Sequence, residues 1–338
     1  MSTLEDFARS EPRRRTALKL GLGVAAAALT GRHAAAANLP STTITLADPL
    51  PEVDARFPSE IAQGVWLLPD HRINLVPNIG IVVGRDSALV IDCGLNPDSG
   101  ARVLDAARKL APGRKLILTT THAHPEHVFG AAPFKGQAEY VLNSAQNDYL
   151  TKSGPTLREM FKGFGQDIAR MLTSAEIVPA TRTYDGDSST IDLGGRTVQL
   201  RNWGTAHSPG DQTIYLPEER VLFSGDMIEE RMFPIVPLFP PQIPASAINT
   251  QRWTEALLEM ERMNPAVIVP GHGNLGGVEL ARTIIHYFQD VQGRVAEGLK
   301  LKGAERTIAD LPPALLASYP TWEHQQFAEL AVRYFVQA

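Results

Sequence analysis

Short apolar runs alternate with segments of helical periodicity along much of the chain. Runs over residues 64–68, 78–83 and 88–92 predict β-strands, and the Gly84–Ser87 link between the last two is typical of a hairpin. Over residues 98–111 the apolar positions instead recur at helical spacing. The amino-terminal part of the chain is therefore predicted to begin with antiparallel strands that lead into a helix.

The remainder of the chain continues the pattern. Residues 115–120 form an apolar run typical of a buried strand, and a strand over 139–142 leads into helical sequence over 143–174. Further strands are predicted over 190–193, 197–200, 213–216, 220–223 and 266–269, with helices over 248–263 and 277–300 and one more within 305–338. This alternation predicts an α/β fold in which helices cover the outer faces of two sheets. No linker is evident after residue 58, so we expect the two halves to pack as one unit.

Residues 1–37 have the composition of an export signal. Arg13–Arg15 precede the apolar run Leu20–Leu29, and the small residues Ala35–Ala37 form a cleavage-type sequence. The run is much shorter than the ~20 residues that a transmembrane helix needs, which predicts no stable membrane anchor. Paired arginines followed shortly by leucine and lysine resemble the twin-arginine signal, which predicts the twin-arginine export machinery as a partner and a periplasmic location. The alternative is a mitochondrial-type or merely basic amino terminus.

Composition excludes several classes of function. The formal net charge is −5, so the chain lacks the basic footprint of a nucleic-acid-binding protein. The one cysteine, Cys93, excludes an internal disulfide framework and any multi-cysteine metal site. Nine histidines remain, and their placement is the most informative feature of the sequence.

A histidine cluster directly follows the apolar run that ends at residue 120. His122 and His124 are two residues apart, so in an extended chain their side chains point the same way. Pro125 turns the chain, so that Glu126 and His127 can face a neighbouring point. Imidazole and carboxylate groups at this spacing are typical of a zinc site.

Four further positions extend the pattern, each at a predicted turn or strand end. They are Asp92, His207 before Ser-Pro-Gly, Asp226 after Ser-Gly, and His272 between two glycines. Alone, each is compatible with an ordinary turn residue. In this order, with the cluster at 122–127, they resemble the metallo-β-lactamase superfamily over about residues 60–290. The resemblance implies a four-layer αβ/βα sandwich with the site at the sheet edges between the halves.

The resemblance also implies a set of metal ligands and two zinc ions per chain. It implies that the first ion is bound by His122, His124 and His207. It implies that the second is bound by His127 and His272, and that Asp226 bridges both. Asp92 resembles the carboxylate that orients a ligand histidine without binding metal. His71, His286 and His324 fall in no motif, and we interpret them as structural.

The sequence departs from the family motif H-x-H-x-D-H at one position, where Glu126 replaces the aspartate. Glu126 either binds the second ion or forms a hydrogen bond to a bound water. Two adjacent ions lower the pKa of a water between them, and Glu126 or Asp226 could move its proton. The predicted activity is hydrolysis of a small-molecule ester, lactone, thioester or lactam.

Two branches of the superfamily share further features with this chain. Asp226 after Ser224-Gly225 resembles glyoxalase II and lactonase-like enzymes. The His-Pro-Glu-His variant with an export signal resembles periplasmic metallohydrolases of sulfur oxidation and quinoprotein systems. A rival interpretation is an iron sulfur-dioxygenase-like oxidoreductase, in which one iron would use His122, His124 and Asp226.

The expected organisation has four parts. Residues 1–37 are the signal peptide, 38–58 an extended lead-in, 59–303 the metallo-β-lactamase-like domain and 304–338 a helical extension. Within the domain, the proline-rich apolar loop 232–244 is either a wall of the pocket or a packing contact, including one in a homodimer.

Overall fold

The computed structural model describes residues 49–338. The predicted signal peptide and the first part of the lead-in therefore lie outside the described residues. Within the described range, none of the helices combines the length and apolar character needed to cross a bilayer.

The first sheet has seven strands that follow one another in chain order. They are β1 (Ser59–Ala62), β2 (Val65–Leu68), β3 (Ile79–Val83), β4 (Ser87–Ile91), β5 (Lys115–Thr119), β6 (Ala138–Asn143) and β7 (Arg182–Tyr184). The first four pair antiparallel, and β4 through β7 pair in parallel. β4 is buried along its whole length, as expected for a central strand covered on both faces.

The second sheet has five strands in the order β12-β11-β10-β9-β8. Their bounds are β8 (Ser188–Asp192), β9 (Thr197–Thr205), β10 (Pro209–Leu216), β11 (Val221–Glu229) and β12 (Val267–His272). β8 to β11 form an antiparallel meander, and β12 joins β11 in parallel. Both sheets are therefore mixed, with parallel pairing where a helix connects the strands.

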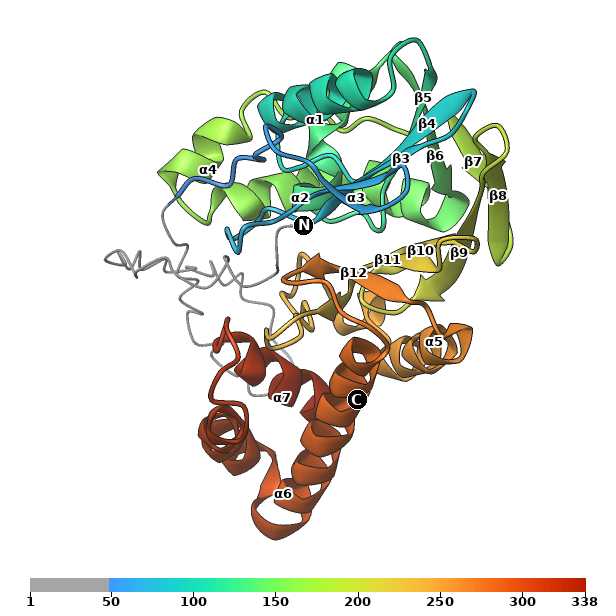
Figure 1. The fold of residues 1–338 in the computed structure, drawn as a ribbon. Coiled ribbons are helices and arrows are strands. Elements are labelled where there is room, and N and C mark those ends of the chain that lie inside the picture. Colours follow the sequence, from blue (N-terminus) through green and yellow to red (C-terminus); the bar gives the residue numbers. More distant parts are fainter. Residues whose placement is uncertain (1–48) are drawn as a thin grey trace.

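Helices cover the outer face of each sheet (Figure 1). α1 (Pro97–Leu110), α2 (Pro125–Val128), α3 (Ser144–Lys162) and α4 (Gln166–Met171) lie on the side of the first sheet, with a 3-10 turn at Phe129–Phe134. α5 (Thr250–Met263), α6 (Glu279–Ser318) and α7 (Phe327–Gln337) lie on the side of the second, after a short 3-10 turn at Ala245–Ala247.

Three apolar clusters separate these layers. One joins α1 and α3 to the first sheet, through residues such as Val103 and Leu150. A second lies between the two sheets and includes Leu89 and Phe223. The third joins the second sheet to α5, α6 and α7. The predicted α/β fold, a four-layer αβ/βα sandwich, is confirmed.

The structure also differs from the sequence-based elements in places. β1 and β7 were not predicted, because both are short edge segments with little apolar content. The helical stretch 143–174 is divided by Gly163 and Gly165 into α3 and α4. α6 continues past residue 300, breaks at Gly303 with a φ of 78°, and ends at Ser318. The carboxyl-terminal segment thus holds two helical pieces, where one was expected.

Candidate metal centre

The ligand side chains come from the ends of strands in both sheets. His122 and His124 lie in the loop after β5, and Pro125 begins α2, which carries Glu126 and His127. The short helix turns the chain after His124. The sequence-predicted change of direction at Pro125 is therefore what the structure shows.

The second sheet supplies the other three ligand residues. His207 occupies the turn between β9 and β10, and His272 is the last residue of β12. Asp226 lies within β11 just after Gly225, where the pairing with β12 shifts register. Gly225 has a φ of 56°, and a Cβ there would stand 2.6 Å from the side chain of Thr121. The glycine therefore allows the strand to bend towards the first sheet and present Asp226.

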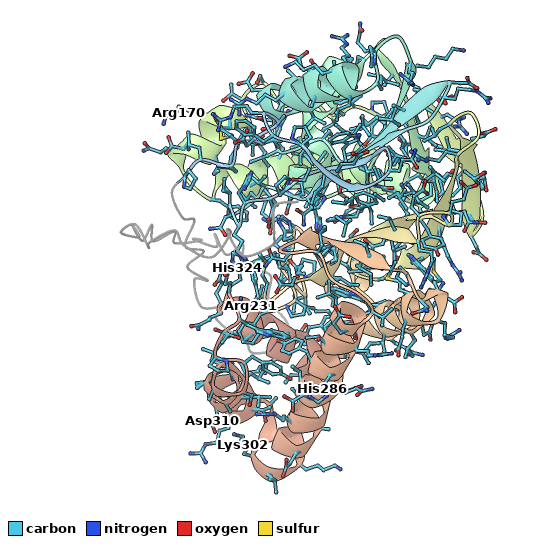
Figure 2. The ribbon with its side chains drawn as sticks, in the orientation of Figure 1. Arg170, Arg231, His286, Lys302, Asp310 and His324 are labelled. Carbon is cyan, nitrogen blue, oxygen red and sulfur yellow. The ribbon has the colours of Figure 1, made fainter. Side chains whose placement is uncertain are left out.

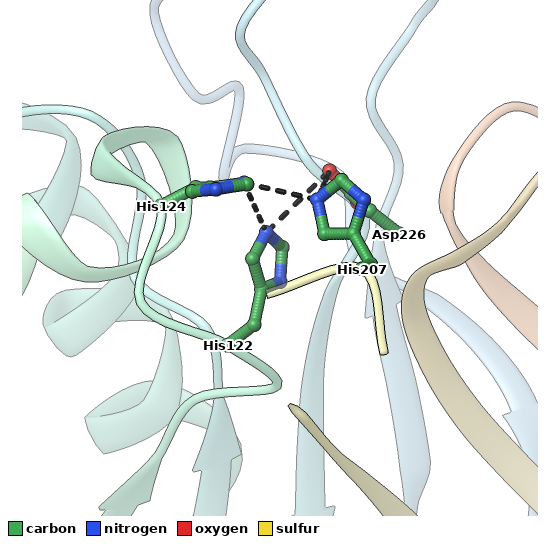
Figure 3. Close-up of side chains that lie close together, drawn as sticks. All are labelled: His122, His124, His207 and Asp226. Carbon is green, nitrogen blue, oxygen red and sulfur yellow. Dashed lines mark hydrogen bonds and ion pairs between the residues drawn. The ribbon is translucent and has the colours of Figure 1, made fainter. Parts of the chain in front are cut away.

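The first ligand group contains His122, His124, His207 and Asp226 (Figure 3). Nδ1 of His124 lies 3.1 Å from His122 Nε2 and 3.0 Å from His207 Nε2. Oδ2 of Asp226 lies 3.6 Å from His122 Nε2 and 4.0 Å from His207 Nε2. In a tetrahedral site with Zn–N bonds of ~2.0–2.1 Å, ligand atoms stand about 3.3 Å apart. The spacing of this group fits such a site.

The second ligand group contains Glu126, His127, Asp226 and His272, whose ligand atoms all lie within 4.8 Å of one another. Oδ1 of Asp226 is 3.3 Å from His127 Nε2 and 3.6 Å from His272 Nε2. Each carboxylate oxygen of Asp226 thus faces a different group. The seven residues predicted as metal ligands are brought together in two adjacent clusters.

The protonation of the first group suits a cation. Burial lowers the pKa of His122 and His124 well below the ordinary histidine value, and lowers that of His207 to about 4. Nδ1 of His207 donates to the carbonyl of Ile235 at 3.0 Å, which leaves Nε2 with its lone pair. Neutral imidazoles that converge on one point are in the state that metal binding requires.

The second group favours a bound cation for another reason, which is the negative charge of its buried carboxylate. Burial lowers the pKa of His127, but the carboxylates of Asp226 and Asp92 outweigh burial and raise it well above the ordinary value. Burial likewise opposes ionisation of Asp226, yet the surrounding histidines hold its pKa well below the ordinary value. Neither oxygen of Asp226 has a hydrogen-bond partner. A divalent ion at each oxygen would satisfy this buried carboxylate.

Asp92 occupies the orienting position that was predicted for it. Its Oδ2 accepts a hydrogen bond from His127 Nδ1 at 2.9 Å, so that His127 Nε2 points to Asp226. Its Oδ1 accepts from the backbone N–H of Thr121 at 2.7 Å. Asp92 has a φ of 66°, which is unusual for a residue other than glycine. Strain of this kind is retained where geometry matters to function.

Glu126 is buried, and its Oε2 has no hydrogen-bond partner. Burial raises the pKa of its carboxyl group. Its place in the second group is compatible with a metal ligand and also with a hydrogen bond to a bound water, so both roles considered from the sequence stay open.

Two carboxylates that support His207 were not predicted. Asp211 accepts hydrogen bonds from the N–H groups of Ala206 and Ser208, at 3.2 and 2.8 Å, and so closes the turn that carries His207. Burial raises the pKa of Asp211 to about 7. Glu229 accepts from the N–H of Ile235 at 2.8 Å, while the carbonyl of Ile235 accepts from His207. Only the turn sequence Ser-Pro-Gly-Asp gave a signal for Asp211, and nothing local marks Glu229.

A pocket opens beside the second group. Its lining comes from the loop after β2, from β11 and the loop that follows it, and from the segment before α7: Arg72, Ile73, Asn74, Leu75, Glu126, Glu229, Met232, Ile235, His272, His324, Gln326 and Phe327. Met232 and Ile235 therefore form a wall, while Phe233 and Val236 of the same loop are buried in the core. Loop 232–244 is thus both a pocket wall and a packing contact, and its part in a homodimer stays a prediction.

The three histidines outside the motifs have different surroundings. His71 is exposed, and His286 is exposed on α6 (Figure 2). His324 instead lines the pocket, and burial lowers its pKa to about 4, so its imidazole is uncharged at neutral pH. The interpretation of His324 as merely structural overlooked this position, because a contact that spans the whole domain leaves no local pattern.

Comparison with known proteins identifies the family. The model of the metallo-beta-lactamase superfamily matches residues 73–272, more than half of the chain. The chain therefore belongs to the metallo-beta-lactamase superfamily. This is the superfamily to which the predicted enzyme class, a metal-dependent hydrolase, was assigned from the sequence.

Relatives in sequence are distant. The chain is 24% identical over 143 residues to metallo-beta-lactamase type 2 of Bacteroides fragilis, covering 42% of this chain and 55% of that protein. It is 25% identical over 190 residues to the α subunit of 2,4-dinitroanisole O-demethylase of Nocardioides, covering 55% of this chain and 51% of that protein. It is 23% identical over 239 residues to linear primary-alkylsulfatase of Pseudomonas, covering 62% of this chain and 44% of that protein. The chain thus spans about half the length of the curated relatives it matches.

Solved structures show the same fold. A metallo-beta-lactamase family protein from Thermus thermophilus aligns with a TM-score of 0.59 and 18% identity, covering 82% of this chain and 94% of that one. The metallo-beta-lactamase FIM-1 from Pseudomonas aeruginosa, in a mono-zinc form, aligns with a TM-score of 0.51 and 20% identity. The alignment covers 68% of this chain and 93% of that one.

Replacement of Asp92 tests the support of His127. In Asp92→Asn, the charge that stabilises the Nδ1–H of His127 is lost, so we expect metal affinity to fall by about 10–100-fold. Competition of the purified protein with a chelator measures this affinity. Asp98→Asn, at an exposed acid in the first turn of α1, is the matched control and should bind metal as the wild type does. Equal affinities in the two variants would contradict the role of Asp92.

Proposed function

We propose that this protein is an exported, zinc-dependent hydrolase with two zinc ions per chain, acting on an ester, lactone, thioester or lactam. The observation that carries the proposal is Asp226, whose two unpartnered oxygens face separate groups of ligands. A single ion would leave one of these groups as an unpaired cluster of buried polar atoms. The arrangement supports two ions over the one iron of a sulfur-dioxygenase-like enzyme.

Different residues of the chain would have different roles in the reaction. His122, His124 and His207 would hold one ion, His127 and His272 the other, and Asp226 both. Bound ions would supply Lewis acidity and water that is acidic enough to react at neutral pH. Glu126 and Asp226 stand where a carboxylate could hold or transfer the proton. Asp92, Glu229 and Asp211 keep the ligand histidines in place and so reduce reorganisation during the reaction.

The relatives support hydrolysis but not one substrate. Their names include a beta-lactamase, an O-demethylase and an alkylsulfatase, which break different bonds. Asp226 after Ser224-Gly225 supports a position near the glyoxalase II and lactonase-like branch. The His-Pro-Glu-His variant together with the amino-terminal sequence supports the periplasmic branch associated with sulfur oxidation or quinoprotein systems.

Elemental analysis and a substrate panel test the proposal. The purified protein, without residues 1–37, should contain about two zinc ions per chain and hydrolyse at least one member of a panel of esters, lactones, thioesters and lactams. His207→Ala removes one ligand of the first group and should abolish turnover, while the circular dichroism spectrum stays that of the wild type. One iron per chain and no zinc would instead support the oxygenase.

Glu126 can be tested separately. If its carboxylate binds the second ion, Glu126→Gln should lower the zinc content towards one per chain, because an uncharged amide is a weak zinc ligand. Glu126→Asp keeps the charge and should retain two. Equal zinc content in wild type, Gln and Asp proteins would place Glu126 outside the ligand set.

The export proposal rests on residues 1–37 of the sequence. Lysine does not reproduce the planar fork of arginine, so replacement of Arg14 and Arg15 by lysine should block twin-arginine export. Fractionation of cells should then find the wild type in the periplasm, beginning near Asn38, and the double variant in the cytosol at full length. Normal export of the double variant would exclude the twin-arginine route.

A further inference from the structure

A large part of the pocket wall is apolar. Ile73, Leu75, Met232, Ile235 and Phe327 contribute side chains to it. The ring of His324 stacks on Phe327, with centroids 5.6 Å apart and planes 29° apart. A substrate group next to this wall would bury apolar surface, which favours alkyl or aryl groups.

Arg72 supplies the pocket's one cationic side chain among the lining residues that the structure describes, and its charge is already paired. Its guanidinium forms an ion pair with Glu323 at 3.1 Å and a second, shorter one with Glu230. The side chain of Arg72 is 26% exposed and that of Glu230 is 13% exposed, so this part of the network is shielded from water. Two carboxylates therefore take up the charge that could bind an anionic substrate.

Other groups at the pocket also disfavour an anionic substituent. The carboxyl groups of Glu126 and Glu229 line it and are buried. His324 is an uncharged imidazole, as described above. An anionic substituent placed beside Arg72, rather than on an ion held by the second group, would lose its hydration without gaining a free cationic side chain.

Backbone hydrogen bonds hold the network in place. The N–H of Glu323 donates to the carbonyl of Arg231 at 2.9 Å, and its own carbonyl accepts from Phe233 at 3.1 Å (the position of Arg231 beside His324 can be followed in Figure 2). The N–H of Asn274, two residues after His272, donates to Glu230 at 3.0 Å. Backbone contacts thus fix the position of Glu323, and one of them holds the carboxylate of Glu230.

From this arrangement we infer that the pocket accepts an uncharged, mainly apolar part of the substrate, as in a neutral ester or lactone, and that the Arg72–Glu230–Glu323 network discriminates against substrates with an anionic group at this position. The inference rests on the proposed hydrolase function. It narrows the substrate class to molecules without a carboxylate or sulfate at this position. Such a group could form an ion pair with Arg72 only if Arg72 were not already paired.

A matched pair of esters tests the inference on the zinc-loaded protein. p-Nitrophenyl pentanoate and mono-p-nitrophenyl glutarate have acyl chains of equal length and differ in a terminal methyl against a carboxylate. We expect kcat/KM to favour the pentanoate by about tenfold or more, mainly through KM, because the carboxylate is desolvated without a partner. Equal or better turnover of the glutarate would overturn the inference.

A substitution that removes one carboxylate charge but nearly keeps the side-chain shape then tests the network itself. Glu323→Gln keeps both backbone hydrogen bonds and releases part of the charge of Arg72. The ratio of kcat/KM for the pentanoate to kcat/KM for the glutarate should therefore fall about two- to fivefold. Glu329→Gln is the matched control, because Glu329 pairs with Arg333 on α7 and does not line the pocket. An unchanged preference in Glu323→Gln, or the same change in both variants, would contradict the role of the network.

Calorimetry separates the two proposals. Titration with the corresponding p-nitroanilides, which keep the same chains but have a more stable bond, measures binding without turnover. Tighter binding of the pentananilide by a protein that hydrolyses neither ester nor any other member of the substrate panel would refute the hydrolase and support the inferred pocket. Hydrolysis of both esters with equal KM would support the hydrolase and refute the inferred pocket.

Discussion

The strongest electrostatic constraint on this protein is one buried carboxylate, that of Asp226, which lies where its two halves meet. Removal of a carboxylate from water costs several kcal/mol unless positive charge or hydrogen bonds replace its hydration. Asp226 has no hydrogen-bond partner for either oxygen and lies within 4.0 Å of a nitrogen of each of four histidines. Two of those histidines follow β5 of the first sheet, and two come from the second half of the chain. The charge therefore has to be balanced across the interface between the sheets, and the fold holds the sheets in the position where a metal can do so.

The chain accepts backbone strain to keep this arrangement. Asp92, which orients His127, has a positive φ, as do Arg72, Leu75 and His324 around the pocket. For residues other than glycine such conformations cost of order 1–3 kcal/mol each, and they persist only where surrounding contacts enforce them. Several of the strained residues that the structure describes thus lie at the site or its pocket. For Asp92, hydrogen bonds with Thr119, Thr121 and His127 are such contacts.

The sequence predicted the architecture, and it marked the residues that the structure brings together as candidate ligands, for a common reason. Strong apolar runs such as 115–120 mark buried strands, and polar residues directly after them, such as His122, lie at a sheet edge where they can meet. Edge strands β1 and β7 lacked that apolar signal. Glu229 and His324 escaped prediction for another reason: their roles depend on contacts with Ile235 and with the pocket, made by segments far apart in the chain. The local sequence pattern predicts which residues follow a strand at the sheet edge. Which residues they contact depends on tertiary packing between distant segments, which the local pattern does not show.

The pairing of Glu323 with the segment at Arg231 to Phe233 has a consequence for the order of synthesis. All seven candidate ligands have been synthesised once His272 has been added, and both sheets can fold when this segment has left the ribosome. The pocket wall at His324 and Phe327 is made only after α6 has been synthesised. A nascent chain can therefore bring its candidate metal ligands together before it acquires this pocket wall. The candidate metal centre and the pocket proposed to select a substrate are completed at different times in the life of the same molecule.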